Sequence, residues 1–210
     1  MKHPRRTFDF SLLPLMEYQG LLIKLDDDVE AGLARLSTLQ ETHDRARAAL
    51  MFVYQVREKD EAWRNDARLR AGLNELYSMQ DAAARGFKLA PASPSAPKLA
   101  ESHNPLIHLM YILRHVNVHT TPLPSTVEQI TVTFRPNTAP EEMTYGEVVL
   151  SQLTISDLLR SNEIKQYYER ADLQAATDWL MNAQRAFGIS EVFSKGISAY
   201  GRELLAAYPE

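Results

Sequence analysis

The fold is decided by one stretch, His103 to Thr121, which reads HNPLIHLMYILRHVNVHTT. Asn104 followed by Pro105 predicts a helix start, because asparagine is a favoured N-cap and the fixed φ of proline suits the first turn. Apolar residues then surround the helix on almost every side, which predicts a buried helix at the centre of the fold. Arg114 is its only permanently charged side chain. Such a cation among apolar residues needs a partner, a ligand or a solvent-filled cleft, so we expect function here.

Length and composition indicate one globular domain. The chain has 210 residues, 45% of them hydrophobic and 24% charged, which is enough to form a sizeable core. The net charge of −4 argues against a broadly basic surface for nucleic acid, although it allows a local cationic site. The absence of cysteine excludes disulfides, thiolate zinc sites and cysteine nucleophiles, and it fits the cytoplasm. No apolar run approaches the ~20 residues of a membrane span, so we expect no membrane partner.

Two long helices are predicted before the central stretch. Apolar residues recur at steps of three and four from Val29 to about Arg57, with His43 on the same stripe. We interpret His43 as a structural, hydrogen-bonded histidine. The second helix runs from about Glu61 to Ala84, and Gly86 is expected to end it.

The segments around these helices have different patterns. Residues 8–25 are apolar enough to form a short helix across the core, and residues 88–101, rich in proline and alanine, are expected to be a mobile loop. Alternating residues in 126–134 and 147–155 predict a β-hairpin over residues 126–155, with a long turn that includes Gly146. Because a lone hairpin is marginal, it must pack on the bundle or pair across an oligomer.

Three helices are predicted in residues 156–208. Ser156 is expected to cap the first, which reaches about Tyr168. Asp172 is expected to cap the second, and Gly188 to end it. Ser190 is expected to cap the third. The fold class is therefore mainly α, an antiparallel helical bundle with one inserted β-hairpin, in a single domain spanning residues 1–210.

The end of the central helix, Arg114-His115-Val116-Asn117-Val118-His119, carries a motif. It resembles the signature of the HEPN superfamily (higher eukaryotes and prokaryotes nucleotide-binding), in which arginine is followed by Asn, Asp or His, then three residues, then histidine. The setting is also similar to that family, a bundle of long antiparallel helices with the motif at the end of a buried one. The resemblance covers roughly residues 28–120 and later helices, whereas the hairpin lies outside the minimal family pattern.

This resemblance implies a metal-independent endoribonuclease without a cofactor, acting as a homodimer whose two motifs face each other. It implies that His119 is the general acid/base and that Arg114 binds the phosphate, while His115 and Asn117 contact the RNA substrate. Tyr111, one turn before His115, is expected to line the same cleft. Histidine titrates near neutrality and arginine offers a rigid fork to phosphate oxygens, which suits these roles. Such an enzyme would be a toxin or defence effector, and an antitoxin protein would be a possible partner.

Two alternatives stay open. Many HEPN domains are non-catalytic RNA-binding, nucleotide-binding or dimerisation modules, and Arg114 would then pair with an acid such as Glu75 or Asp81. The other alternative is a metal-binding bundle. His108, His115 and His119 are spaced by seven and four residues along one helix face, and a histidine pair four residues apart can chelate zinc or nickel.

Overall fold

The computed structural model describes residues 6–16, 23–91, 94–119, 125–134, 141–151 and 153–209. It is mainly helical with one two-stranded antiparallel hairpin, which confirms the predicted fold class. The elements, with η for short 3-10 turns, are η1 (Phe10–Leu12), α1 (Asp27–Arg35), η2 (Ser37–Leu39), α2 (Gln40–Tyr54), α3 (Ala62–Lys88), η3 (Leu99–Glu101), α4 (Pro105–His119), β1 (Ser125–Phe134), β2 (Glu141–Leu150), α5 (Ile155–Leu158), α6 (Asn162–Tyr167) and α7 (Arg170–Ala207).

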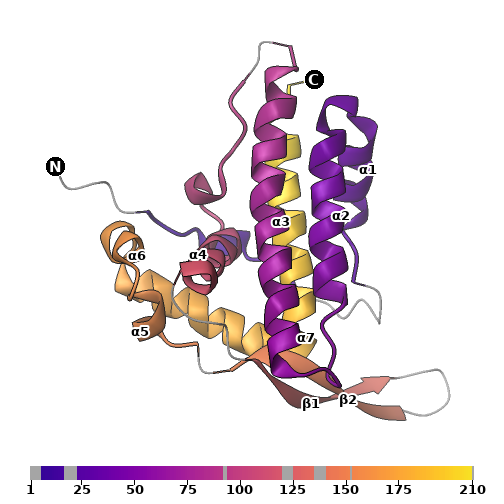
Figure 1. The fold of residues 1–210 in the computed structure, drawn as a ribbon, viewed down its shortest axis with the longest axis vertical. Helices are drawn as coiled ribbons and strands as arrows, with labels where there is room; N and C mark the ends of the chain where they lie inside the picture. Colours follow the sequence, from indigo (N-terminus) through magenta and orange to yellow (C-terminus); the bar gives the residue numbers. More distant parts are fainter. Residues whose placement is uncertain are drawn as a thin grey trace.

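A helical bundle forms the body of the molecule. Helix α2 packs against both α3 and α7, and α1 packs against α2 and α7. Helices α2 and α3 and the second half of α7 all run along the long axis of the molecule (Figure 1). Helix α4 is seen nearly end-on in Figure 1, so it crosses α3 and α7, which it contacts, instead of running along them. The hairpin lies at the lower end of the bundle in the same view. None of the described helices is both long and apolar enough to span a bilayer.

Helix α7 changes direction at Gly188. This residue has φ 77° and ψ 159°, a conformation that is almost restricted to glycine. The first half of α7 therefore runs across the bundle and the second half runs along it (Figure 1). The sequence predicted a helix end at Gly188, and this break is confirmed. The helix begins at Arg170, however, so the expected cap at Asp172 is wrong.

The helix predicted from Val29 to about Arg57 is wrong in its length. It is divided into α1 and α2 because Leu36 has an extended backbone, with φ −95° and ψ 100°. A 3-10 turn, η2, follows the break. Gly86 explains how this turn packs: it lies inside α3 instead of ending it, and a Cβ there would clash with the backbone oxygen of Thr38. The absent side chain thus serves close packing of η2 on α3, not a helix stop.

The N-terminal segment and the hairpin also differ from their predictions. Residues 8–16 contain only the turn η1 and no longer helix, since the backbone N–H of Asp9 bonds to His103 and ties the chain to the segment before α4. Residues 17–22 lie outside the described part. Strand β2 ends at Leu150, and Gly146 pairs with Gln129 within the ladder instead of forming the turn.

The hairpin packs on the bundle, which is one of its two expected supports. The side chain of Gln184 on α7 bonds to both the N–H and the C=O of Leu150, at 2.8 and 2.9 Å. After β2, a capping box of Thr154 and Asp157 begins α5. The single helix predicted from Ser156 to about Tyr168 is therefore wrong, because Ser161 caps a separate helix, α6.

Candidate functional site

Helix α4 is fixed at its N-terminus by the predicted cap. The backbone N–H of Leu106 donates to Asn104 Oδ1 at 2.9 Å, and the side-chain amide of Asn104 donates to the carbonyl of Leu12, also at 2.9 Å. The apolar residues that follow are almost completely buried. The helix is therefore held rigidly, and its C-terminal half positions the motif.

Arg114 is half-buried on the side of α4 that faces α3. Its Nε lies 3.4 Å from Asn74 Oδ1, and its guanidinium carbon lies 4.3 Å from the centre of the Tyr77 ring, a cation–π geometry. Neither expected acidic partner pairs with it: Glu75 binds Arg45 at 3.0 Å, and Asp81 makes no ion pair with Arg114. Within the described residues, no carboxylate neutralises Arg114. Its charge is consequently available to an anion.

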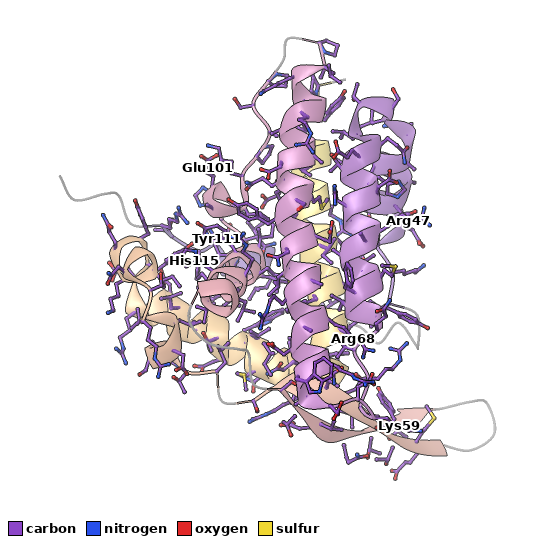
Figure 2. All side chains as sticks on the ribbon, in the orientation of Figure 1. Arg47, Lys59, Arg68, Glu101, Tyr111 and His115 are labelled. Atoms are coloured by element: carbon purple, nitrogen blue, oxygen red, sulfur yellow. The ribbon has the colours of Figure 1, made fainter. Side chains whose placement is uncertain are left out.

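Tyr111 and His115 lie one turn apart on α4, beside α3 (Figure 2). Their rings stack with centroids 6.5 Å apart and an interplanar angle of 27°. Both side chains are half-buried, and Tyr111 precedes Arg114 by three residues and His115 by four, so each of them is its neighbour on the helix surface. The structure thus brings together three of the five predicted site residues.

The N-terminal segment adds a second cation to this face. The guanidinium of Arg6 lies 5.8 Å from the centre of the Tyr111 ring and 5.0 Å from that of Tyr167. We call the following set the aromatic–cation cluster: Arg6, Tyr77, Tyr111, Arg114, His115 and Tyr167. The sequence could not reveal Arg6, Tyr77 or Tyr167, because they come from three separate segments with no shared pattern.

The other two predicted residues are placed only by their backbone. Helix α4 continues to His119, so position 119 lies one helical turn after His115. The side chains of Asn117 and His119 lie outside the described part of the chain. Their proposed roles therefore stay predictions.

His108 is occupied by structural hydrogen bonds. Its Nδ1 lies 2.7 Å from the hydroxyl of Tyr168, and its Nε2 bonds to the carbonyl of Ser102. Because Arg6 donates to the Tyr168 hydroxyl at 2.8 Å, this hydroxyl can donate to Nδ1, which leaves the Nε2 proton for Ser102. Burial lowers the pKa of His108 to about 4, so the ring is neutral.

These contacts argue against the alternative in which His108, His115 and His119 hold a metal. A ligating imidazole must leave one nitrogen free for the metal, and both nitrogens of His108 already have partners. In the part of the chain that the structure describes, no group of three or more histidine, aspartate or glutamate side chains is arranged to hold a metal ion.

Comparisons with models of protein families, with curated proteins and with solved structures found no match. The available charge of Arg114 and the stacked ring of His115 are the features on which a function can be built.

Proposed function

We propose that the protein is a metal-independent endoribonuclease of HEPN type that cleaves RNA at a composite site formed by two copies of α4. The observation that carries the proposal is the cation of Arg114, which is half-buried, held in place by Asn74 and Tyr77, and without a carboxylate partner among the described residues. A fixed guanidinium with a free charge is suited to hold a phosphate group.

The chemistry needs no metal or cofactor. The 2′-oxygen of the RNA attacks the adjacent phosphorus, its proton passes to a base, and the bond from phosphorus to the 5′-oxygen breaks while an acid protonates that oxygen. His119 supplies the proton-transfer group, since imidazole can act as acid or base near neutral pH. Arg114 stabilises the charge that develops on the phosphorane oxygens. The products are a 2′,3′-cyclic phosphate and a free 5′-hydroxyl.

The aromatic–cation cluster supplies a surface for unpaired RNA. Bases of single strands stack on tyrosine, histidine and arginine planes, and such stacking is tolerant of sequence. Tyr111 and His115 offer these planes on the helix that carries Arg114, and the guanidinium of Arg6 lies over Tyr111. His115 and Asn117 are proposed to contact the substrate. The proposal includes a toxin or defence role restrained by an antitoxin protein.

The same cluster favours a second candidate, a non-catalytic module that binds RNA or nucleotides. Stacked rings and two arginines are sufficient for binding, whereas cleavage also requires the proton transfer assigned to His119. The two candidates differ in a single respect. The enzyme turns over RNA, and the module binds it and leaves it intact.

Cleavage of a labelled single-stranded RNA pool in EDTA distinguishes them. We expect the wild-type protein to cleave, and we expect Arg114→Ala to lose ~10²–10³ in rate and His119→Ala ~10²–10⁴, because each removes one contribution to the transition state. Arg85→Ala, at an exposed arginine paired with Glu41, is the matched arginine control and should cleave normally.

The histidine control is His43→Ala. His43 is buried on α2, with Nε2 3.0 Å from the Glu30 carboxylate, so this variant should lose stability and keep its activity. A wild-type protein that binds the RNA pool and leaves it uncut would favour the binding module. Equal cleavage by the wild type and by both motif variants would refute the enzyme, since a contaminant would then be responsible.

A further inference from the structure

A cavity of about 420 Å³ lies far from the motif, between the end of α2, strand β2 and the bend of α7. Its apolar walls include Val56, Met143 and Phe187, and Tyr54 and Tyr145 add aromatic surface. None of its lining residues belongs to α4. This volume falls in the range of small-molecule sites, which are typically apolar with a few well-placed polar groups.

Glu191 lines this cavity and is unusual in its surroundings. It is only 6% exposed, and its Oε1 atom is buried without a hydrogen-bond partner. It belongs to a run from Gly188 to Gly201 in which every residue is buried. A buried carboxylate oxygen without a partner is costly and is rarely kept in a native structure.

The other polar side chains of this buried run all have partners. They are Ser190 (carbonyl of Val53, 3.1 Å), Ser194 (carbonyl of Lys24, 2.6 Å), Lys195 (Asp26, 2.8 Å), Ser198 (N–H of Asp26, 3.0 Å) and Tyr200 (carbonyl of Pro97, 2.9 Å). The helix therefore satisfies its polar groups wherever the protein itself can do so. Glu191 is the exception: it lines the cavity beside Ser190, but only Ser190 has a partner there within the protein.

Two more carboxylates line the same space. Glycine allows both to approach the backbone closely: a Cβ at Gly188 would lie 2.5 Å from Glu147 Oε2, and a Cβ at Gly146 would clash with the carboxylate of Glu58. Burial raises the pKa of Glu147 to about 7, and burial also raises the pKa of Glu191. The charges of Arg57 and Lys195 act in the opposite direction, on Glu147 and Glu191 respectively, but they offset the effect of burial only in part.

Arg57 lines this cavity as well, but the contacts of its guanidinium are with Tyr54 and Val56 and not with a carboxylate of the cavity. The guanidinium of Arg57 lies 4.5 Å from the centre of the Tyr54 ring and donates to the carbonyls of Tyr54 and Val56. Lys195 pairs with Asp26. Three carboxylates thus face a space in which no described cationic side chain forms an ion pair with them.

We propose that this cavity binds a small organic ammonium ion with an apolar body. The ammonium group would bond to Glu191 and Glu147, and the body would lie against Val56, Met143 and Phe187. A metal ion is disfavoured, because within the described residues no three acidic or histidine side chains converge as metal ligands. The apolar and aromatic walls also suit a carbon skeleton better than a hydrated metal.

Calorimetric titration of the full chain tests this at about pH 8, above the pKa of Glu147. The probes are 2-phenylethylamine and hexylamine, each compared with the alcohol of the same skeleton, together with calcium chloride. We expect one amine site per chain and binding of the alcohol weaker by about tenfold or more, because hydrogen bonds to charged groups are the stronger ones.

Glu191→Gln keeps the shape of the side chain and removes its charge, and it should weaken amine binding by about tenfold or more. Glu147→Gln should do the same, and it keeps the test decisive if the first variant fails to fold. Glu41→Gln is the control, since Glu41 is an exposed carboxylate at the opposite end of α2. Equal affinity for amine and alcohol, unchanged binding in both cavity variants, saturation by calcium alone, or no binding of either amine up to about 10 mM would each overturn the proposal.

Discussion

Gly188→Ala tests how the bend of α7 is maintained. Gly188 has φ 77° and ψ 159°, and a residue with a side chain is strained in this region by about 1–3 kcal/mol. The new Cβ would also lie 2.5 Å from Oε2 and 2.9 Å from Cδ of Glu147. Forcing extra atoms into a packed site typically costs a further ~1–3 kcal/mol. Here we expect about 1 kcal/mol, because the glutamate side chain can turn away from the new Cβ.

Alanine also restricts the unfolded chain, which offsets about 0.4–1 kcal/mol. We therefore expect the free energy of unfolding to fall by about 1–3.5 kcal/mol. Urea unfolding followed by circular dichroism measures this change from the shift of the midpoint. The double variant Gly188→Ala with Glu147→Ala removes the contact but keeps the backbone strain, so a double-mutant cycle separates the two causes.

Gly32→Ala is the matched control. Gly32 lies in α1, and its Cβ would meet only the end of the Leu205 side chain, at 2.5 Å. Because alanine is the better helix former, this substitution should change stability by no more than about 1 kcal/mol. If Gly188→Ala were as stable as Gly32→Ala, the bend would not depend on glycine at position 188, and the reasoning would be refuted.

Three further outcomes follow from the same structure. Burial raises the pKa of Glu147 to about 7, so the folded protein retains a proton that the unfolded chain releases above about pH 4.5, and stability should fall as pH rises from 4.5 to 7. Glu147→Gln should therefore be more stable than wild type at about pH 8, by about 1–2 kcal/mol after allowance for the partial solvent exposure of Glu147. Urea unfolding of both proteins at about pH 4.5 and about pH 8 measures this difference. The imidazole of His108 should titrate near pH 4 in NMR spectra, because it is buried and neutral, and a midpoint above about 6 would contradict this. Light scattering should give a homodimer at micromolar concentration, with residues 114–119 near the two-fold axis, whereas a monomer would remove the composite site.

The sequence predicted the features that depend on local chemistry. Asn104 and Pro105 start a helix because the cap and the fixed φ act within one turn, and Gly188 breaks one because its backbone conformation is local. The interruption at Leu36 was missed, since the apolar periodicity continues through it. It depends on the packing of η2 against Gly86, some fifty residues away in the chain.

In the candidate site, too, the residues grouped by local spacing could be predicted, whereas those contributed by distant segments could not. Tyr111, Arg114 and His115 could be grouped from their helical spacing alone. Their neighbours Arg6 and Tyr77 come from distant segments, so only the folded chain brings them together. The sequence also did not indicate that Glu191 is buried, because an acidic residue between apolar ones is normally expected on the exposed face of a helix.

Mass spectrometry of the RNA ends tests the proposed function most directly. Wild-type protein in EDTA should yield fragments with a 2′,3′-cyclic phosphate or its opened form and a 5′-hydroxyl, and a 2′-deoxy nucleotide at the cut site should block the reaction. Arg114→Ala should yield almost none of these products. Fragments with a 5′-phosphate and a 3′-hydroxyl, or cyclic products formed equally by Arg114→Ala, would contradict cleavage by 2′-hydroxyl attack at this site.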